Sequence, residues 1–279
     1  MAFKDDPSPE EYRAFKDFLE TACGILLGDN KQYLVKSRLR KIMEDGKIDT
    51  LGHLVNKLKP GLHGNLRESV IDAMTTNETL WFRDTHPFRI LADKIIPEVS
   101  EKAGAQALRI WSAACSTGQE PYSMAIVVDE YKQARPTQLR GGVDIVATDI
   151  SKRVLERAKS GTYEMLAIGR GLSKERQNRY FCQTADGLWQ VKKEIQKRVE
   201  FRELNLLDNY VSLGKFDAIF CRNVLIYFST DLKKDILSRM HAVLKPGGYL
   251  VLGASESLTD FPDQYEMVHC SPGIIYRAK

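Results

Sequence analysis

The chain has 279 residues, of which 43% are hydrophobic and 28% are charged, and its formal net charge is +4. This composition is typical of one large globular domain, or of a domain with a smaller appendage, and it excludes a low-complexity chain. Because the charge is nearly balanced, any basic surface must come from local clustering.

The five cysteines are scattered, with neither a CxxC pair nor a histidine at metal-ligand spacing, so we expect no disulfide framework and no metal site. The first residues, MAFKDDPSPEE, lack an apolar signal segment, and no apolar run reaches the length of a membrane span. These features predict a cytoplasmic protein.

Residues 1–73 predict an all-α N-terminal domain. An apolar stripe at helical spacing follows Ser8 and Pro9, which mark a helix start. Its members are Phe15, Phe18, Leu19 and Ala22. A second helix, around residues 31–44, carries four basic side chains that either form a docking surface or a solvated face. They are Lys36, Arg38, Arg40 and Lys41.

Residues 74–84, with the sequence MTTNETLWFRD, place polar side chains directly before Leu80, Trp81 and Phe82. A simple turn would need only the polar residues, and a core segment only the apolar ones. The combination predicts a polar connecting loop of the kind that binds a ligand, held in place by its aromatic residues.

Residues 85–279 predict a doubly wound α/β domain, because β-rich runs alternate with helix-like segments. The expected strands are 108–114, 143–148, 199–204, 216–221 and 248–254, and the expected helices are 121–132, 151–160 and 230–244. Two further runs, near 265–270 and 274–277, flank an SPG turn and predict a terminal antiparallel hairpin. The pair Asp186 and Gly187 predicts a turn in a small antiparallel β-insertion, at about 178–201.

Polar or small residues follow several of the predicted strands, where a doubly wound sheet binds ligands. Small residues between Trp111 and Ser123 let the backbone turn tightly near a ligand, although a purely structural turn has the same pattern. Asp149 could accept hydrogen bonds from ribose hydroxyls or could favour the next helix through its dipole. Asn205, Arg222 and Asn223 also stand at strand ends, where they could bind adenine or substrate.

The turn after the first strand contains one glycine and no GxGxxG pattern. Dinucleotide sites need glycines because backbone N–H groups surround a pyrophosphate, whereas S-adenosylmethionine has no phosphate. Glu120 could accept from its ammonium or ribose, or could stabilise its own helix. The pattern therefore favours S-adenosylmethionine.

Six motifs, taken in order, resemble the CheR-type chemotaxis receptor methyltransferases over nearly the whole chain. They are TTNETLWFRD, IWSAACSTGQEPYS, ATDIS, NLLD, FDAIFCRNVLIYF and LKPGGYLVLGASES. The resemblance implies a class I methyltransferase fold and methyl transfer from S-adenosylmethionine to glutamate side chains of bacterial chemoreceptors. The products would be glutamyl methyl esters and S-adenosylhomocysteine. A glutamate is already ionised at neutral pH, so this reaction needs no general base.

The resemblance also implies a set of cofactor-binding residues: Asn77, Thr79, Arg83, Glu120, Asp149, Asn205, Leu206, Arg222 and Asn223. Arg83 could in addition meet the incoming glutamate. Tyr227 could orient that glutamate or could be a core tyrosine.

Chemoreceptor methylation regions are acidic helical bundles in this family, so the basic helix could steer them to the enzyme. Some members bind a receptor C-terminal pentapeptide through the β-insertion, but residues 184–189 form a shorter segment here, and we expect no such tether.

Two alternatives remain: a methyltransferase of the same fold acting on RNA or a small metabolite, and a non-catalytic cofactor-binding regulator of receptors. The basic helix lacks interleaved aromatic residues, so we expect no nucleic acid partner. The sequence has no coiled-coil heptad repeat that would indicate an oligomer, so we expect a monomer.

Overall fold

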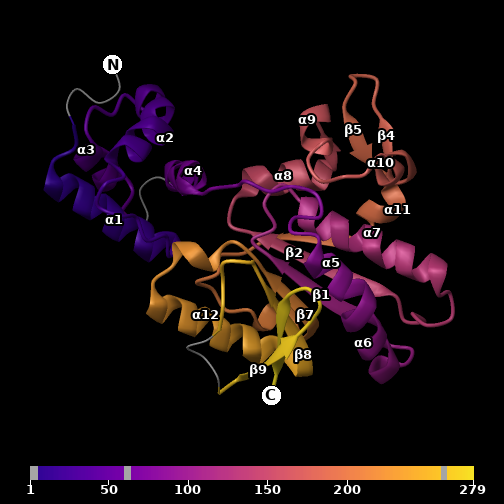
Figure 1. The fold of residues 1–279 in the computed structure, drawn as a ribbon. Coiled ribbons are helices and arrows are strands. Elements are labelled where there is room, and N and C mark those ends of the chain that lie inside the picture. The colour runs from indigo at the N-terminus through magenta and orange to yellow at the C-terminus, as the bar shows by residue number, and fades with distance from the viewer. Residues whose placement is uncertain (1–5, 60–63, 259–262) are drawn as a thin grey trace. The chain divides into compact units, whose positions relative to one another are not determined.

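The computed structural model describes residues 6–59, 64–258 and 263–279. The chain divides into two compact units, and Figure 1 labels helices and strands of each. The helical unit contains the chain up to Thr76 together with residues 205–207 and 227–233. The α/β unit contains residues 77–204, 208–226 and the chain from Lys234 onward.

The helical unit begins with four helices, drawn in indigo and violet in Figure 1. They are α1 Pro9–Cys23, α2 Gln32–Asp45, α3 Leu51–Lys57 and α4 Gly64–Met74. At the start of α1 the Ser8 hydroxyl accepts from the Glu11 N–H, and the Glu11 carboxylate accepts from the Ser8 N–H. This reciprocal cap satisfies two backbone donors that the helix leaves unpaired. Phe15 and Leu19 of the predicted stripe are fully buried, which confirms the all-α N-terminal region.

The α/β unit is built on a seven-stranded sheet with the order β6-β2-β1-β7-β8-β10-β9. Its first five strands are parallel: β6 Val199–Glu203, β2 Val143–Asp149, β1 Leu108–Ala113, β7 Phe216–Cys221 and β8 Leu244–Leu252. The antiparallel edge consists of β10 Ile274–Ala278 and β9 Tyr265–His269. The predicted doubly wound sheet with a terminal hairpin is thus confirmed.

Strand β8 begins four residues before the predicted run at Gly248. Leu244 pairs with Phe216, and the next pair joins Tyr249 to Ala218, so the intervening KPGG segment forms a bulge within the strand. Proline and two glycines resemble a turn in the sequence, which is why the pattern alone misplaced the start.

Helices precede the first strand of the main sheet and connect its later strands. Before β1 lie α5 His86–Ile90, the π-helical turn η1 Leu91–Ile95 and α6 Ile96–Ala103. Between strands lie α7 Gln119–Ala134, α8 Lys152–Ser160 and α12 Thr230–Val243. The chain also has short 3₁₀ turns at η2 Val211–Leu213 and η3 Leu225–Tyr227.

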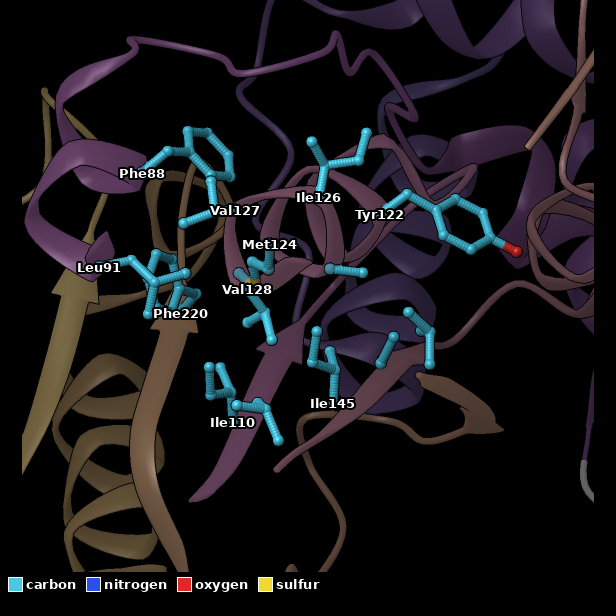
Figure 2. Packing of buried hydrophobic residues seen from close by; sticks show 14 of the residues in the cluster. Phe88, Leu91, Ile110, Tyr122, Met124, Ile126, Val127, Val128, Ile145 and Phe220 are labelled. Carbon is cyan, nitrogen blue, oxygen red and sulfur yellow. The ribbon is translucent and has the colours of Figure 1, made fainter. Parts of the chain in front are cut away.

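A buried apolar core fixes α7 on the sheet. Figure 2 shows Val128 of α7 pointing toward the strands that carry Ile110 and Ile145, with Leu91 of η1 beside Phe220 of β7. All five side chains are essentially inaccessible to solvent. Because such cores pack as densely as organic crystals, the strand ends next to them are held in fixed positions.

A small three-stranded antiparallel sheet, in the order β3-β5-β4, interrupts the alternation. Its elements are β3 Thr162–Tyr163, α9 Met165–Ile168, α10 Lys174–Tyr180, β4 Phe181–Gln183, β5 Trp189–Val191 and α11 Lys193–Gln196. Its hairpin turns at Gly187, whose φ is +77°. The two-residue strand β3 has no detectable periodicity, and Val199 already belongs to the main sheet, so this subdomain begins and ends earlier than the sequence indicates.

Within the described parts of the chain, none of the helices combines the length and apolar character that crossing a membrane would require.

Candidate functional site

The strands β2, β1 and β7 are neighbours and parallel, so the segments that follow them leave the same edge of the sheet. After β1 the chain continues to β2 on one side, while β7 lies on the other side of β1. This is the topological switch point at which doubly wound sheets bind their ligands. The predicted site residues Glu120, Asp149, Arg222 and Asn223 stand at or after the ends of these strands.

Asp149, at the end of β2, holds the turn that follows β1. One carboxylate oxygen accepts from the Ser116 N–H at 2.8 Å, and the other accepts from the Ser151 N–H at 3.0 Å. Ser116 itself has a left-handed backbone with φ of +50°. Gly118 has φ of +91°, and a Cβ there would lie 2.9 Å from the Ala158 Cβ. The sequence anticipated a ligand contact for Asp149 but not this structural one.

Arg222, at the end of β7, is the centre of a buried polar cluster. Its side chain is 1% exposed, and Nη1 donates to Glu120 at 2.8 Å. Nη2 donates to the Asp84 carboxylate at 2.7 Å and to the Arg83 carbonyl at 2.9 Å. One guanidinium therefore joins the end of β7, the first turn of α7 and the polar loop.

Glu120 lies between Arg222 and Ser112, whose hydroxyl donates to the other carboxylate oxygen at 2.8 Å. Burial raises the pKa of Glu120, and the Arg222 guanidinium opposes that rise. The negative charge of Glu120 suits a cationic ligand, and its two donors already hold the carboxylate in a fixed orientation. The Glu120 side chain is only 13% exposed, so a ligand would meet it in a poorly solvated environment.

The polar loop, predicted at residues 74–84, occupies residues 75–85 between α4 and α5 and is anchored by its aromatic residues as the sequence predicted. Trp81 is fully buried and packs edge-on against Tyr163 and Phe181, with ring centroids 5.0 and 5.1 Å away. Phe82 is 5% exposed, and its N–H donates to the Ser123 hydroxyl at 3.1 Å. The Asn77 carbonyl accepts from the Ser116 hydroxyl at 2.8 Å, which links this loop to the β1 turn.

The backbone of this loop is strained. Phe82, Asp84 and Thr85 have φ angles of +49°, +64° and +55°. Left-handed conformations cost energy in residues other than glycine and persist only where the surroundings hold them. Here the Arg222 guanidinium supplies part of that restraint through its bonds to Asp84 and to the Arg83 carbonyl.

Arg83 and Thr79 are half-buried, and Arg83 Nη1 donates to the Glu78 carbonyl at 3.2 Å. Asn223 follows Arg222 with φ of +59°, and its N–H donates to the Glu256 carboxylate at 2.8 Å. The remaining predicted residues, Asn205, Leu206 and Tyr227, belong to the helical unit. In that unit the Asn205 amide donates to the Ala22 carbonyl at 2.8 Å.

Three residues that bond to the predicted site residues were missed by the sequence analysis: Ser112, Asp84 and Glu256. Asp84 stands next to Arg83 in a segment already singled out, so a search for acidic partners of Arg222 could have found it. The contact of Ser112 with Glu120 cannot be recognised in the sequence, because it depends on the geometry of strand β1. Glu256 stands in a strand-end motif, but no spacing in the sequence connects it with Asn223.

The four basic residues of α2 are not equivalent. Arg40 and Lys41 are exposed, whereas Lys36 pairs with Asp6 at 2.5 Å. Arg38 donates to the carbonyls of Met74 and Thr75 at 2.7 and 3.2 Å. These carbonyls lie at the C-terminal end of α4, where helical carbonyls lack backbone partners, so Arg38 has a structural function within the helical unit.

Among the described residues, no group of His, Cys, Asp or Glu side chains is arranged to hold a metal ion.

Comparison with known proteins identifies the family. The model of the CheR methyltransferase SAM-binding domain matches residues 77–274, and that of the CheR all-alpha domain matches residues 10–75. The chain belongs to the CheR methyltransferase family. It is therefore an S-adenosylmethionine-dependent methyltransferase, and the resemblance, the cofactor and the fold predicted from the sequence are confirmed.

Relatives of this CheR-family enzyme match it along most of their length. The chemotaxis protein methyltransferase 1 of Pseudomonas aeruginosa is 60% identical over 96% of this chain and 98% of its own. A chemotaxis protein methyltransferase of Vibrio parahaemolyticus is 53% identical over 98% of both chains. That of Escherichia coli is 35% identical over 93% of this chain and 88% of its own.

Proposed function

We propose that this CheR-family enzyme methylates glutamate side chains of bacterial chemoreceptors, forming glutamyl methyl esters and S-adenosylhomocysteine. The observation that carries the proposal is the 60% identity to a chemotaxis protein methyltransferase over nearly the full length of both chains. At this level of identity over whole chains, we expect the substrate class to be shared as well as the fold.

The strand-end residues fit S-adenosylmethionine. The oriented carboxylate of Glu120 suits the methionyl ammonium, and the small-residue turn after β1, shaped by Asp149, lets the backbone approach a ligand closely. We propose that Glu120 holds the ammonium and that Asp149 holds the ribose. The other proposed contacts come from Asn77, Thr79, Arg83, Asn205, Leu206 and Asn223. Arg222 contributes to binding by orienting Glu120 and the polar loop, since its guanidinium is already bonded to both.

The protein has to align the reacting groups and to limit their solvation. When bound, S-adenosylmethionine supplies a methyl group activated by its positive sulfur. Held by Glu120 and Asp149, it would supply this methyl group to a receptor carboxylate, and the electron pair of the broken carbon–sulfur bond would leave with S-adenosylhomocysteine. Arg83 would orient the incoming carboxylate through its charge, and Tyr227 through its hydroxyl. No step requires a proton acceptor, because the attacking carboxylate is ionised.

The proposed docking surface for the acidic receptor helices consists of Arg40 and Lys41, with Lys36 next to them on α2. Exposed charges of this kind raise association rates more than they raise affinity. We propose in addition that the enzyme works in the cytoplasm as a monomer and does not bind a receptor C-terminal pentapeptide.

Methylation with tritiated S-adenosylmethionine and receptor-containing membranes tests this function. We expect label in receptor protein that mild base releases as volatile methanol, because methyl esters hydrolyse in base whereas methylated amines do not. Label in RNA or in a small molecule, or cofactor binding with no transfer at all, would contradict the proposal.

A further inference from the structure

Glu256 is a half-buried carboxylate that accepts hydrogen bonds from four backbone N–H groups. Oε2 accepts from Asn223 and Gly253, each at 2.8 Å. Oε1 accepts from Val224 at 3.0 Å and from Leu225 at 2.8 Å. The donors come from two segments, one following β7 and the other following β8.

These two segments begin side by side, because Cys221 pairs with Leu252 at the ends of the parallel strands β7 and β8. The first one leaves regular structure at once: Asn223 has a left-handed backbone with φ of +59°, and the next two amides have no strand or helix partner of their own. Without Glu256 these N–H groups would lose the acceptor that fixes their direction. The carboxylate thus sets the backbone path from Asn223 to Leu225.

Gly253 gives independent evidence that this arrangement is tightly built. A Cβ at this position would lie 2.7 Å from Glu256 Oε2 and 2.8 Å from Asn223 Nδ2. It would also lie 2.9 Å from the Asn223 backbone nitrogen. Real Cβ atoms do not approach so closely, so any side chain at Gly253 would displace Glu256 or Asn223.

We infer that Glu256 is a positioning residue of the methyl-transfer site, which holds residues 223–225 in the conformation that presents Asn223 to the cofactor. The inference rests on the proposed cofactor role of Asn223. It requires an ionised carboxylate, since four donors converge on two oxygens and a carboxylate has only acceptors. A glutamine would turn one acceptor into an NH₂ group that faces two backbone N–H groups.

The test compares Glu256→Gln with Glu101→Gln, a matched change at an exposed glutamate of α6. In calorimetric titration with S-adenosylhomocysteine, the dissociation constant of Glu256→Gln should be at least about tenfold higher than that of the unaltered enzyme. A change of this size corresponds to the loss of one charge-assisted hydrogen bond. Hydrogen exchange of the Val224 and Leu225 amides should accelerate in the same variant. Neither property should change in Glu101→Gln.

Two further variants separate the possible outcomes. Gly253→Ala should weaken binding as Glu256→Gln does, because it displaces the same groups without removing a charge. Asn223→Ala tests the role on which the inference rests. If Asn223→Ala weakens binding and Glu256→Gln does not, the inference alone is wrong. If neither weakens binding, the cofactor role of Asn223 and the inference both fall, while methyl transfer to receptors stands on its own assay.

Discussion

The proposed site residues in the two units are held in opposite ways. At the edge of the sheet, Arg222 and Asp149 are buried and the Glu120 side chain is 13% exposed, and each is bonded to other parts of the α/β unit. On α2 of the helical unit, Arg40 and Lys41 are exposed to solvent. Buried groups that bond one another determine both stability and ligand geometry, whereas exposed charges act at a distance on association. Substitutions should therefore affect different measurements in the two places.

Replacing Arg222 should have the largest effect. Arg222→Met would leave Glu120 and Asp84 without their cation, and we expect a loss of about 2–4 kcal/mol in the free energy of unfolding. This loss is at the lower end of the usual cost of breaking a buried ion pair, because the Asp84 side chain is 32% exposed. Binding of S-adenosylhomocysteine should be lost as well, since Glu120 and the polar loop are no longer oriented. Urea unfolding and calorimetric titration measure the two effects.

Two companion variants define what the Arg222 result means. Arg222→Lys keeps the charge but lacks the planar fork that reaches three acceptors, so it should recover only part of the stability. Arg40→Met makes the same change as Arg222→Met at an exposed position and should shift the free energy of unfolding by no more than about 0.5 kcal/mol. Equal losses at Arg222 and Arg40 would show that the buried cluster does not stabilise the fold.

The sequence predicted the sheet, the hairpin and the strand-end positions because each depends on a local pattern of apolar, small and polar residues. It also predicted that Trp81 anchors the polar loop, since an aromatic residue beside polar ones has few other uses. It did not predict that Arg222 bonds Asp84 and Glu120, or that Arg38 caps α4, because these contacts join residues distant in the chain. A charged side chain looks the same in a sequence whether it faces solvent or a buried partner. These missed contacts of Arg222 and Arg38 are therefore polar and long-range.

Glu120 gives the next effect, which depends on pH. Because burial raises its pKa above the ordinary value of 4.5, protonation begins at a higher pH than in an exposed glutamate. Protonation removes the acceptor proposed for the ammonium, so affinity for S-adenosylhomocysteine should fall as the pH falls through this raised pKa. The contribution of Glu120 to stability has the opposite sign: it is present below the pKa of the unfolded chain and is lost as the pH rises through the folded pKa.

Calorimetric titrations and urea unfolding at the same series of pH values measure the two slopes, that of cofactor affinity against pH and that of the free energy of unfolding against pH. Glu120→Gln cannot ionise, so both slopes attributed to Glu120 should disappear in it, and its affinity should be low throughout. If the affinity of the unaltered enzyme keeps the same pH dependence as that of Glu120→Gln, the ionised carboxylate does not hold the cofactor.

The smallest effect on the protein itself should come from α2. We expect the double variant Arg40→Glu and Lys41→Glu to fold normally and to bind S-adenosylhomocysteine with unchanged affinity. Its kcat/KM for receptor methylation should fall by about tenfold or more at low salt, because reversed charges slow the encounter with an acidic partner. The difference from the unaltered enzyme should shrink as salt is added, since exposed charges are screened within about 10 Å at 0.1 M ionic strength.

Arg38 is the matched contrast on the same helix. Arg38→Ala removes the donors to the Met74 and Thr75 carbonyls, so it should lower the free energy of unfolding by about 1 kcal/mol. Its effect on methylation should change little with salt, because it arises from a short-range contact within the helical unit. If the Arg40 and Lys41 double variant also lowered stability while showing no salt dependence, α2 would be a structural helix with a solvated face, and receptor docking would have to be sought on another surface.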